Sequence, residues 1–216
     1  MTALHYRPAA DASVRATFVF AHGAGAGQTH PFMTSFAEAM ADLGFDLVTF
    51  NFPYMEAGRK LPDRAPVLEV CYARVIAGVR ERIDSARRFL FIGGKSMGGR
   101  MATQLAAADS SLAVSGLLML GYPLHPPGKP QQRRDAHLPK VGRPMLIVQG
   151  SRDAFGTPDE MTPVLAPIVP AATLHVIAGG DHSFKIPRTP GRTQAMVDNE
   201  VRETCGRWMH AVMAGA

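Results

Sequence analysis

One stretch, residues 89–100 (FLFIGGKSMGGR), constrains the fold of the chain more than any other. It opens with four apolar residues, as at the end of a buried strand, and after Gly93 the motif G-x-S-x-G follows at Gly94–Gly98. Apolar residues then recur at four-residue intervals over 97–105, which predicts one face of a helix. We therefore expect Ser96 at a sharp turn from a strand into a helix, where both glycines avoid collisions with neighbouring backbone.

Two nucleotide-binding patterns overlap this chain in part. The phosphate-binding pattern G-x-x-x-x-G-K-S would need a glycine at position 89 and a loop after it, but the chain has Phe89 and the strand residues 90–92. A dinucleotide fingerprint is suggested by Gly23–Gly25, but Gln28 stands where its third glycine is required. Both mismatches disfavour a nucleotide site.

The rest of the chain alternates apolar strands with helical patterns. Six strands are expected, within residues 16–21, 45–52, 89–92, 114–120, 145–148 and 174–177. A long amphipathic helix is expected from Leu68 to the basic pair Arg87-Arg88. This alternation indicates an α/β fold, a three-layer α/β/α sandwich around a mostly parallel sheet of about six strands. No linker or repeat interrupts the series, so residues 1–216 are predicted to form a single domain.

Composition narrows the class of protein. With 216 residues, 46% of them hydrophobic, the chain can bury a core without metal or disulfide support, and Cys71 and Cys205 are expected as buried thiols. The net charge of +5 is spread along the sequence, which favours a solvated basic surface over nucleic-acid binding. No stretch has the ~18 apolar residues of a membrane span, and the N-terminus lacks a signal-peptide core. A soluble, cytoplasmic protein is expected.

Ser96 would need partners to act as a nucleophile. A serine hydroxyl requires a base to take its proton and an acid to orient that base, and in this architecture they follow in the order serine, acid, histidine. Asp153 follows one predicted strand, and His182 follows the last one, after two glycines. Asp159 is better explained as part of a helix start, and Asp181 is the immediate neighbour of the histidine. We predict Ser96, Asp153 and His182 as the catalytic residues.

Two backbone N–H groups are candidates for an oxyanion hole. The first belongs to Met97, directly after the serine. The second is expected in the loop after the first strand, where Ala24 is the preferred donor and Gly25 the alternative, because small residues let a substrate approach the backbone.

Four further residues are predicted to border the substrate. Tyr54, Tyr122 and His125 lie in loops after predicted strands, and Lys95 precedes the nucleophile. Lys95 either favours an anionic substrate or reaches solvent. The interval 121–144 contains six prolines, which disfavours a packed helical lid, so the site is expected to be open and to suit short acyl groups.

The motifs HGAGAG, GGKSMGGR, GSRD and GGDHSF, taken together, resemble those of the small lidless α/β-hydrolases related to dienelactone hydrolases. They resemble more closely the α/β-hydrolase-like group that includes a testis-expressed vertebrate protein and a subunit of a histone-acetylating complex. The resemblance spans the first strand to the last helix. It implies Ser96 as nucleophile, His182 as base and Asp153 as acid, whereas dienelactone hydrolases proper have a cysteine at the position of Ser96.

These observations predict a serine hydrolase that cleaves a small ester or thioester through an acyl-enzyme intermediate. No metal or organic cofactor is implied, and the expected partner is a small-molecule substrate, with the protein as a monomer or homodimer. Nucleic-acid and membrane partners are not expected. The alternative is a non-catalytic binding or scaffold protein that uses a hydrolase fold.

Overall fold

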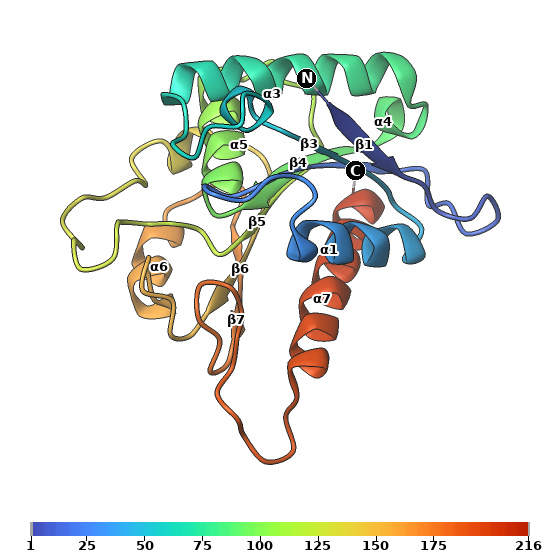
Figure 1. The fold of residues 1–216 in the computed structure, drawn as a ribbon. Helices are drawn as coiled ribbons and strands as arrows, with labels where there is room; N and C mark the ends of the chain where they lie inside the picture. The colour runs from blue at the N-terminus through green and yellow to red at the C-terminus, as the bar shows by residue number, and fades with distance from the viewer. Residues whose placement is uncertain (1, 216) are drawn as a thin grey trace.

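The computed structural model describes residues 2–215 and contains one seven-stranded sheet flanked by helices (Figure 1). The strands are β1 (Ala3–Tyr6), β2 (Thr17–Ala21), β3 (Asp46–Phe50), β4 (Leu90–Lys95), β5 (Gly116–Leu120), β6 (Met145–Gly150) and β7 (Thr173–Ile177). The helices are α1 (Pro31–Asp42), α2 (Pro53–Glu56), α3 (Ala65–Arg82), α4 (Ser85–Arg88), α5 (Met97–Ala108), α6 (Pro158–Leu165) and α7 (Gln194–Ala214). The α/β prediction is confirmed.

The sheet has one strand more than the sequence predicted. Its order is β1-β3-β2-β4-β5-β6-β7, with all neighbours parallel except β1, which runs antiparallel to β3. β1 has only four residues, alternately exposed and half-buried, and lies at the edge of the sheet. A short strand without a buried apolar run gives no strong sequence signal, which explains why it was not predicted.

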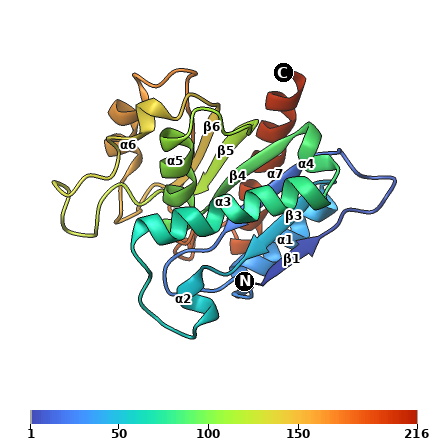
Figure 2. The same cartoon turned by 90° about the horizontal axis from the view of Figure 1, so that it is seen from above.

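Alternate strand residues supply two separate hydrophobic cores. Residues such as Val19 and Ile92 face α3, α5 and α6, whereas their neighbours Phe18 and Phe91 face α1 and α7. Figure 2, viewed from above, shows α3 in front of the sheet and α1 and α7 behind it. Both faces of the central strands are therefore covered, as their continuous apolar sequences require.

The helix predicted from Leu68 to Arg87-Arg88 is shorter than expected. α3 ends at Arg82 because the backbone of Ile83 is extended (φ −120°, ψ 113°) and its side chain packs against the core. The pair Arg87-Arg88 lies in the separate short helix α4. The apolar spacing of Ile83 matched the helix, but the residue belongs to the turn that follows it.

The topology brings the loops after β2 and β4 together. β2 lies between β3 and β4, and in the parallel register Ala21 is paired with Gly94. The chain continues from β2 to β3 on one side and from β4 to β5 on the other, so the strand order reverses between β2 and β4. Ligand sites of open α/β sheets form at such a switch point, beyond the carboxyl ends of the strands. The loops after β6 and β7 end at the same edge of the sheet.

The interval after β5 contains no helical lid. Its only helical element in the described chain is a 3₁₀ turn at Leu138–Lys140, and Figure 1 shows the remainder as an extended loop beside α5 and α6. None of the helices within residues 2–215 combines the length and the apolarity that crossing a membrane requires.

Candidate active site

Ser96 occupies a strained turn between β4 and α5. Its backbone has φ 50° and ψ −115°, a conformation that L-residues rarely adopt. A side chain at Gly94 would overlap the Ala21 carbonyl oxygen, and one at Gly98 would lie 2.7 Å from the Ala21 carbonyl carbon. The two glycines therefore allow the turn to pass directly over the end of β2, which exposes the serine at the edge of the sheet.

His182 connects Ser96 to a buried carboxylate. The Nε2 atom of His182 lies 2.8 Å from the Ser96 Oγ, and its Nδ1 atom lies 2.8 Å from the Asp153 Oδ2. An ionised carboxylate can only accept, so Nδ1 carries the ring hydrogen and Nε2 is free to accept the hydroxyl proton. The structure thus places the three residues in the contacts that a nucleophile, a base and an orienting acid need.

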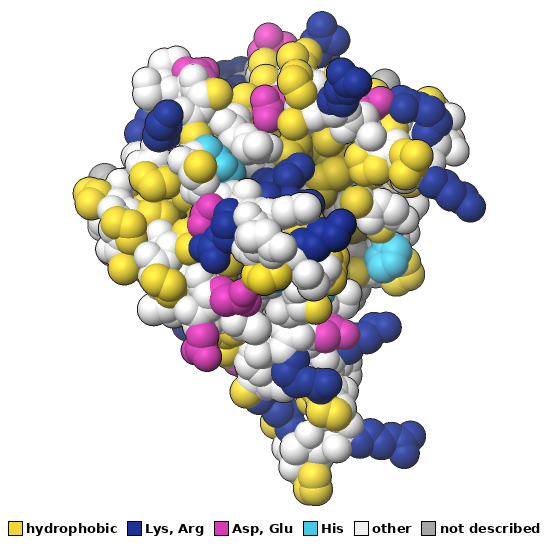
Figure 3. Space-filling model, turned by 90° about the vertical axis from the view of Figure 1, so that its left-hand side faces the viewer, with side chains coloured by type: hydrophobic (Ala, Val, Ile, Leu, Met, Phe, Trp, Pro, Cys, Tyr) yellow, Lys and Arg dark blue, Asp and Glu magenta, His cyan; other side chains and the backbone are white. Residues whose placement is uncertain are grey.

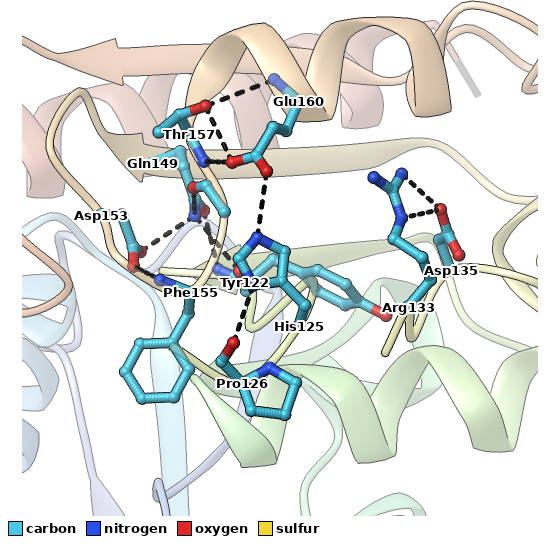
Figure 4. A network of polar contacts seen from close by, with 11 residues as sticks. Tyr122, His125, Pro126, Arg133, Asp135, Gln149, Asp153, Phe155, Thr157 and Glu160 are labelled. Carbon is cyan, nitrogen blue, oxygen red and sulfur yellow. Dashed lines mark hydrogen bonds and ion pairs between the residues drawn. The ribbon is translucent and has the colours of Figure 1, made fainter. Parts of the chain in front are cut away.

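The Asp153 carboxylate is completely buried and fully hydrogen-bonded. Besides His182, it accepts hydrogen bonds from the Gln149 Nε2 (2.9 Å) and the Phe155 backbone N–H (2.8 Å), as Figure 4 shows. The Phe155 ring stacks on the imidazole of His182 at a centroid distance of 4.1 Å. Neither Gln149 nor Phe155 was predicted from the sequence. Phe155 follows β6 by a few positions in the same loop as Asp153, and such a loop is a natural place to look for groups that hydrogen-bond to the acid.

The peptide between Gly23 and Ala24 has a fixed orientation. The Phe52 N–H donates to the His22 Nε2 (3.1 Å), so the His22 Nδ1–H donates to the Gly23 carbonyl oxygen (2.8 Å). The Tyr54 hydroxyl lies 3.5 Å from the same oxygen, and burial lowers the pKa of His22, which keeps its ring neutral. Because this peptide is trans, the Ala24 N–H points away from those buried groups.

The first N–H of α5 belongs to a residue that lines the same pocket as this peptide. Met97 is the first residue of the helix, so its N–H has no partner within the helix and lies at the positive end of the helix dipole. Met97 and Ala24 both line the pocket that holds Ser96, whereas Gly25 does not. This arrangement favours Ala24 over Gly25 as the second donor.

Ser96 and His182 line a pocket of about 640 Å³. Its walls combine apolar side chains, such as Leu68 and Phe155, with several Lys and Arg side chains. Figure 3 shows a hydrophobic hollow with Lys and Arg side chains in and around it. The pocket is large enough for a small organic molecule.

Comparison with known proteins agrees with this geometry. A family model described as an alpha/beta hydrolase domain matches residues 14–210. The chain belongs to the alpha/beta hydrolase family. A serine hydrolase without a lid from Xanthomonas campestris has 21% identity and a TM-score of 0.73, with 95% of this chain and 88% of that chain covered.

Two further hydrolase structures share the fold of this alpha/beta hydrolase. A dienelactone hydrolase from Anabaena variabilis has 19% identity and a TM-score of 0.74, over 97% of this chain and 90% of that chain. An alpha-beta serine hydrolase homologue from Coxiella burnetii has 20% identity and a TM-score of 0.73, over 95% and 89% of the two chains. The resemblance to lidless, dienelactone-hydrolase-like proteins is confirmed. Membership of the alpha/beta hydrolase family supports a hydrolase activity for this chain.

Three of the predicted substrate-binding residues of this hydrolase do not line the pocket. Tyr54 is completely buried, with its hydroxyl toward the Gly23 carbonyl in the loop that follows β2, called the oxyanion loop below. Tyr122 is also buried, and its hydroxyl donates to the Arg134 carbonyl oxygen (2.6 Å). The prediction was wrong for both because these aromatic side chains turn inward and support loops.

His125 is the third such residue. Its ring forms hydrogen bonds from Nδ1 to the Pro126 carbonyl oxygen (2.9 Å) and from Nε2 to the Glu160 carboxylate (3.2 Å), as Figure 4 shows. Glu160 in turn caps the start of α6 by accepting from the Thr157 N–H (2.8 Å). His125 therefore joins the loop after β5 to α6, and the prediction that it borders the substrate was wrong.

Lys95 borders the pocket, as predicted, and its contribution to the choice of an anionic substrate stays a prediction. Its ammonium donates to the His182 backbone carbonyl and lies 5.4 Å from the centre of the Phe184 ring. Burial lowers the pKa of Lys95 to about 8. The lysine therefore links the loop that carries His182 to the end of β4.

Proposed function

We propose that this protein is a serine hydrolase that cleaves a small ester or thioester, with Ser96, His182 and Asp153 as its catalytic residues. The observation that carries the proposal is the continuous chain of hydrogen bonds from the Asp153 carboxylate through His182 to the Ser96 hydroxyl, at the wall of an open pocket. The hydrolase family and the lidless neighbours support the same reaction class.

In the first half of the reaction, His182 Nε2 takes the Ser96 proton while Oγ forms a bond to the substrate carbonyl carbon. The carbonyl electron pair moves onto oxygen, where the N–H groups of Ala24 and Met97 would stabilise the charge. Asp153 holds the Nδ1–H tautomer and stabilises the imidazolium. The tetrahedral intermediate then collapses, the bond to the leaving oxygen or sulfur breaks, and His182 gives that atom its proton.

In the second half, water enters and the same groups act again. His182 takes a proton from water, whose oxygen bonds to the acyl carbon, and returns it to Ser96 Oγ as the acyl bond breaks. The products are a carboxylic acid and an alcohol or thiol, so one water molecule is consumed per turnover. An open site allows water to reach the acyl group without a lid movement.

The shape of the site favours a short acyl group. The pocket of about 640 Å³ is bounded by the oxyanion loop and the loop after β5, and the latter contributes Pro123 and Arg134 rather than a helical cover. A long acyl chain would leave much of its surface in water, which removes the burial that makes long chains bind. We therefore propose a small-molecule substrate.

The test uses a fluorophosphonate probe and nitrophenyl esters of increasing acyl length. We expect wild type to be labelled and to hydrolyse the short esters fastest, Ser96→Ala to lose labelling, and His182→Ala to lose turnover with a melting temperature within a few degrees of wild type. A folded wild-type protein with neither serine-dependent labelling nor turnover would instead be a binding protein on a hydrolase fold.

A further inference from the structure

Two arginine side chains line the pocket without a carboxylate partner. Arg100 and Arg134 both border the cavity that contains Ser96, and neither forms an ion pair with an acidic residue in the described chain. The Nε of Arg100 is buried and has no hydrogen-bond acceptor among residues 2–215. The Arg100 guanidinium thus makes no hydrogen bond or ion pair within the described chain, so the part of it that lines the pocket is not engaged by another side chain.

The backbone of Arg100 is held in α5. The residue lies in the first turn of α5, and its backbone N–H donates to the Ser96 carbonyl oxygen (3.1 Å). Its side chain is half-buried, and burial together with the nearby charge of Arg134 lowers its pKa. Arg100 is thus four residues from the nucleophile in sequence, and both residues line the same pocket.

Arg134 is fixed by the loop after β5. Its backbone N–H donates to the Leu124 carbonyl (2.9 Å), and its own carbonyl accepts from the buried Tyr122 hydroxyl (2.6 Å). The preceding residue, Arg133, has a different setting because it pairs with Asp135 at 2.7 Å and does not line the pocket. The loop therefore presents one arginine to the site and neutralises its neighbour.

The charge of the lining has the same sign. Within the described chain it comprises four basic side chains and one acidic side chain, namely Lys95, Arg100, Arg134, Lys185 and Asp63. Asp63 is paired with Arg59 at 2.8 Å, and the ammonium of Lys95 is engaged by the His182 carbonyl. Neither arginine has a carboxylate within ion-pair distance in the described chain, although the charge of Glu69 acts on Arg100 from further away. Like charges held together in a pocket are stabilised by an anion.

We propose that Arg100 and Arg134 bind a carboxylate of the substrate, which makes this enzyme selective for small anionic esters or thioesters. The inference rests on the proposed hydrolase function and deepens it. Guanidinium groups match the geometry of a carboxylate with paired N–H donors, and such charged hydrogen bonds are about twice as strong as neutral ones.

The experiment compares charged and neutral esters in pairs. One pair carries the charge on the acyl side, mono-4-nitrophenyl adipate against 4-nitrophenyl hexanoate, and the other on the leaving group, 4-acetoxybenzoate against its methyl ester. The ratio of kcat/KM for charged over neutral ester is measured in wild type, Arg100→Gln, Arg134→Gln and the matched control Arg133→Gln. We expect the ratio for one pair to fall about 10- to 100-fold, mainly through KM, in Arg100→Gln and Arg134→Gln, and to stay unchanged in the control.

The pair that responds identifies the side of the ester that carries the carboxylate. If the two pocket variants change neither ratio, or change both members of each pair equally, the anion site is refuted while the hydrolase function stands. If wild type turns over no ester and takes no probe, the hydrolase function fails. Calorimetry with adipate then tests the anion site separately, because binding that Arg100→Gln abolishes supports it and equal heats in both proteins refute it.

Discussion

The substitution Asp153→Asn tests the hydrogen-bond arrangement around the base. The two carboxylate oxygens accept from three donors, the Phe155 N–H at Oδ1 and the Gln149 Nε2 and His182 Nδ1 at Oδ2. An asparagine has only one acceptor oxygen, and its NH₂ group must face donors on the other side. Either orientation of the amide therefore creates a clash between donors in a site that is completely buried.

Both orientations predict a measurable loss. With the NH₂ toward His182, the imidazole must accept at Nδ1, so its hydrogen moves to Nε2 and the ring can no longer take the Ser96 proton. With the oxygen toward His182, the tautomer is kept, but the neutral amide no longer stabilises the imidazolium that forms during the reaction. An equivalent change in another serine hydrolase lowers kcat about 10⁴-fold, or about 5 kcal/mol. One buried donor without an acceptor costs about 1–3 kcal/mol of unfolding free energy, which lowers the melting temperature of a chain of this size by about 2–12 °C.

The assay measures kcat for a short nitrophenyl ester and the melting temperature of Asp153→Asn beside a matched control, Asp181→Asn. Asp181 lies next to His182 but accepts through a single oxygen from the Ser183 and Lys185 N–H groups, which an asparagine can also do. We expect kcat to fall at least about 10²-fold in the first variant and to change less than about threefold in the second. Comparable kcat values for Asp153→Asn and wild type would refute the argument.

Three further predictions concern the turn between β4 and α5, the oxyanion loop and Lys95. Gly98→Ala places a methyl group against the Ala21 backbone, so we expect a loss of about 1–3 kcal/mol or more in chemical unfolding, together with loss of probe labelling. His22→Ala releases the Gly23 carbonyl, so kcat should fall about 10- to 100-fold with little change in KM. Lys95 has a pKa of about 8 in the folded chain and its ordinary value of 10.5 in the unfolded chain, so above pH 8 the unfolded state binds more protons. The unfolding free energy of wild type should therefore rise relative to that of Lys95→Met between pH 8 and 10, and a flat difference would contradict the assigned burial.

The sheet and its helices could be predicted because their sequences are periodic. Continuous apolar runs such as 116–120 indicate strands that are covered on both faces. Because these runs alternate along the chain with helical patterns, they predict a parallel sheet with helices on both sides. β1 could not be predicted, since a four-residue edge strand buries too little to leave a pattern. The end of α3 was misplaced because the apolar side chain of Ile83 continues the helical spacing while its backbone is extended.

The position of the candidate site could also be predicted, because the loops that follow parallel strands all begin at the same edge of the sheet, where the carboxyl ends of the strands lie. Chain order therefore indicated Ser96, Asp153 and His182, and the structure places them in contact. Their catalytic roles stay predictions until variants are measured.

The direction of loop side chains could not be predicted. Tyr54 and Tyr122 turn inward to hold backbone carbonyls, while Arg100 and Arg134, which are 34 positions apart, meet at one pocket. These outcomes depend on which buried carbonyl needs a donor and on the path of a proline-rich loop. The local periodicity of apolar residues predicts neither property.

The central claim is that Ser96 forms a covalent acyl-enzyme. Intact-mass and peptide mass spectrometry of protein quenched during turnover of a short nitrophenyl ester measures this directly. We predict an added mass equal to one acyl group on the peptide that contains Ser96, and neither adduct nor turnover in Ser96→Ala. Continued turnover in Ser96→Ala, or an acyl group found only on another residue, would contradict the account.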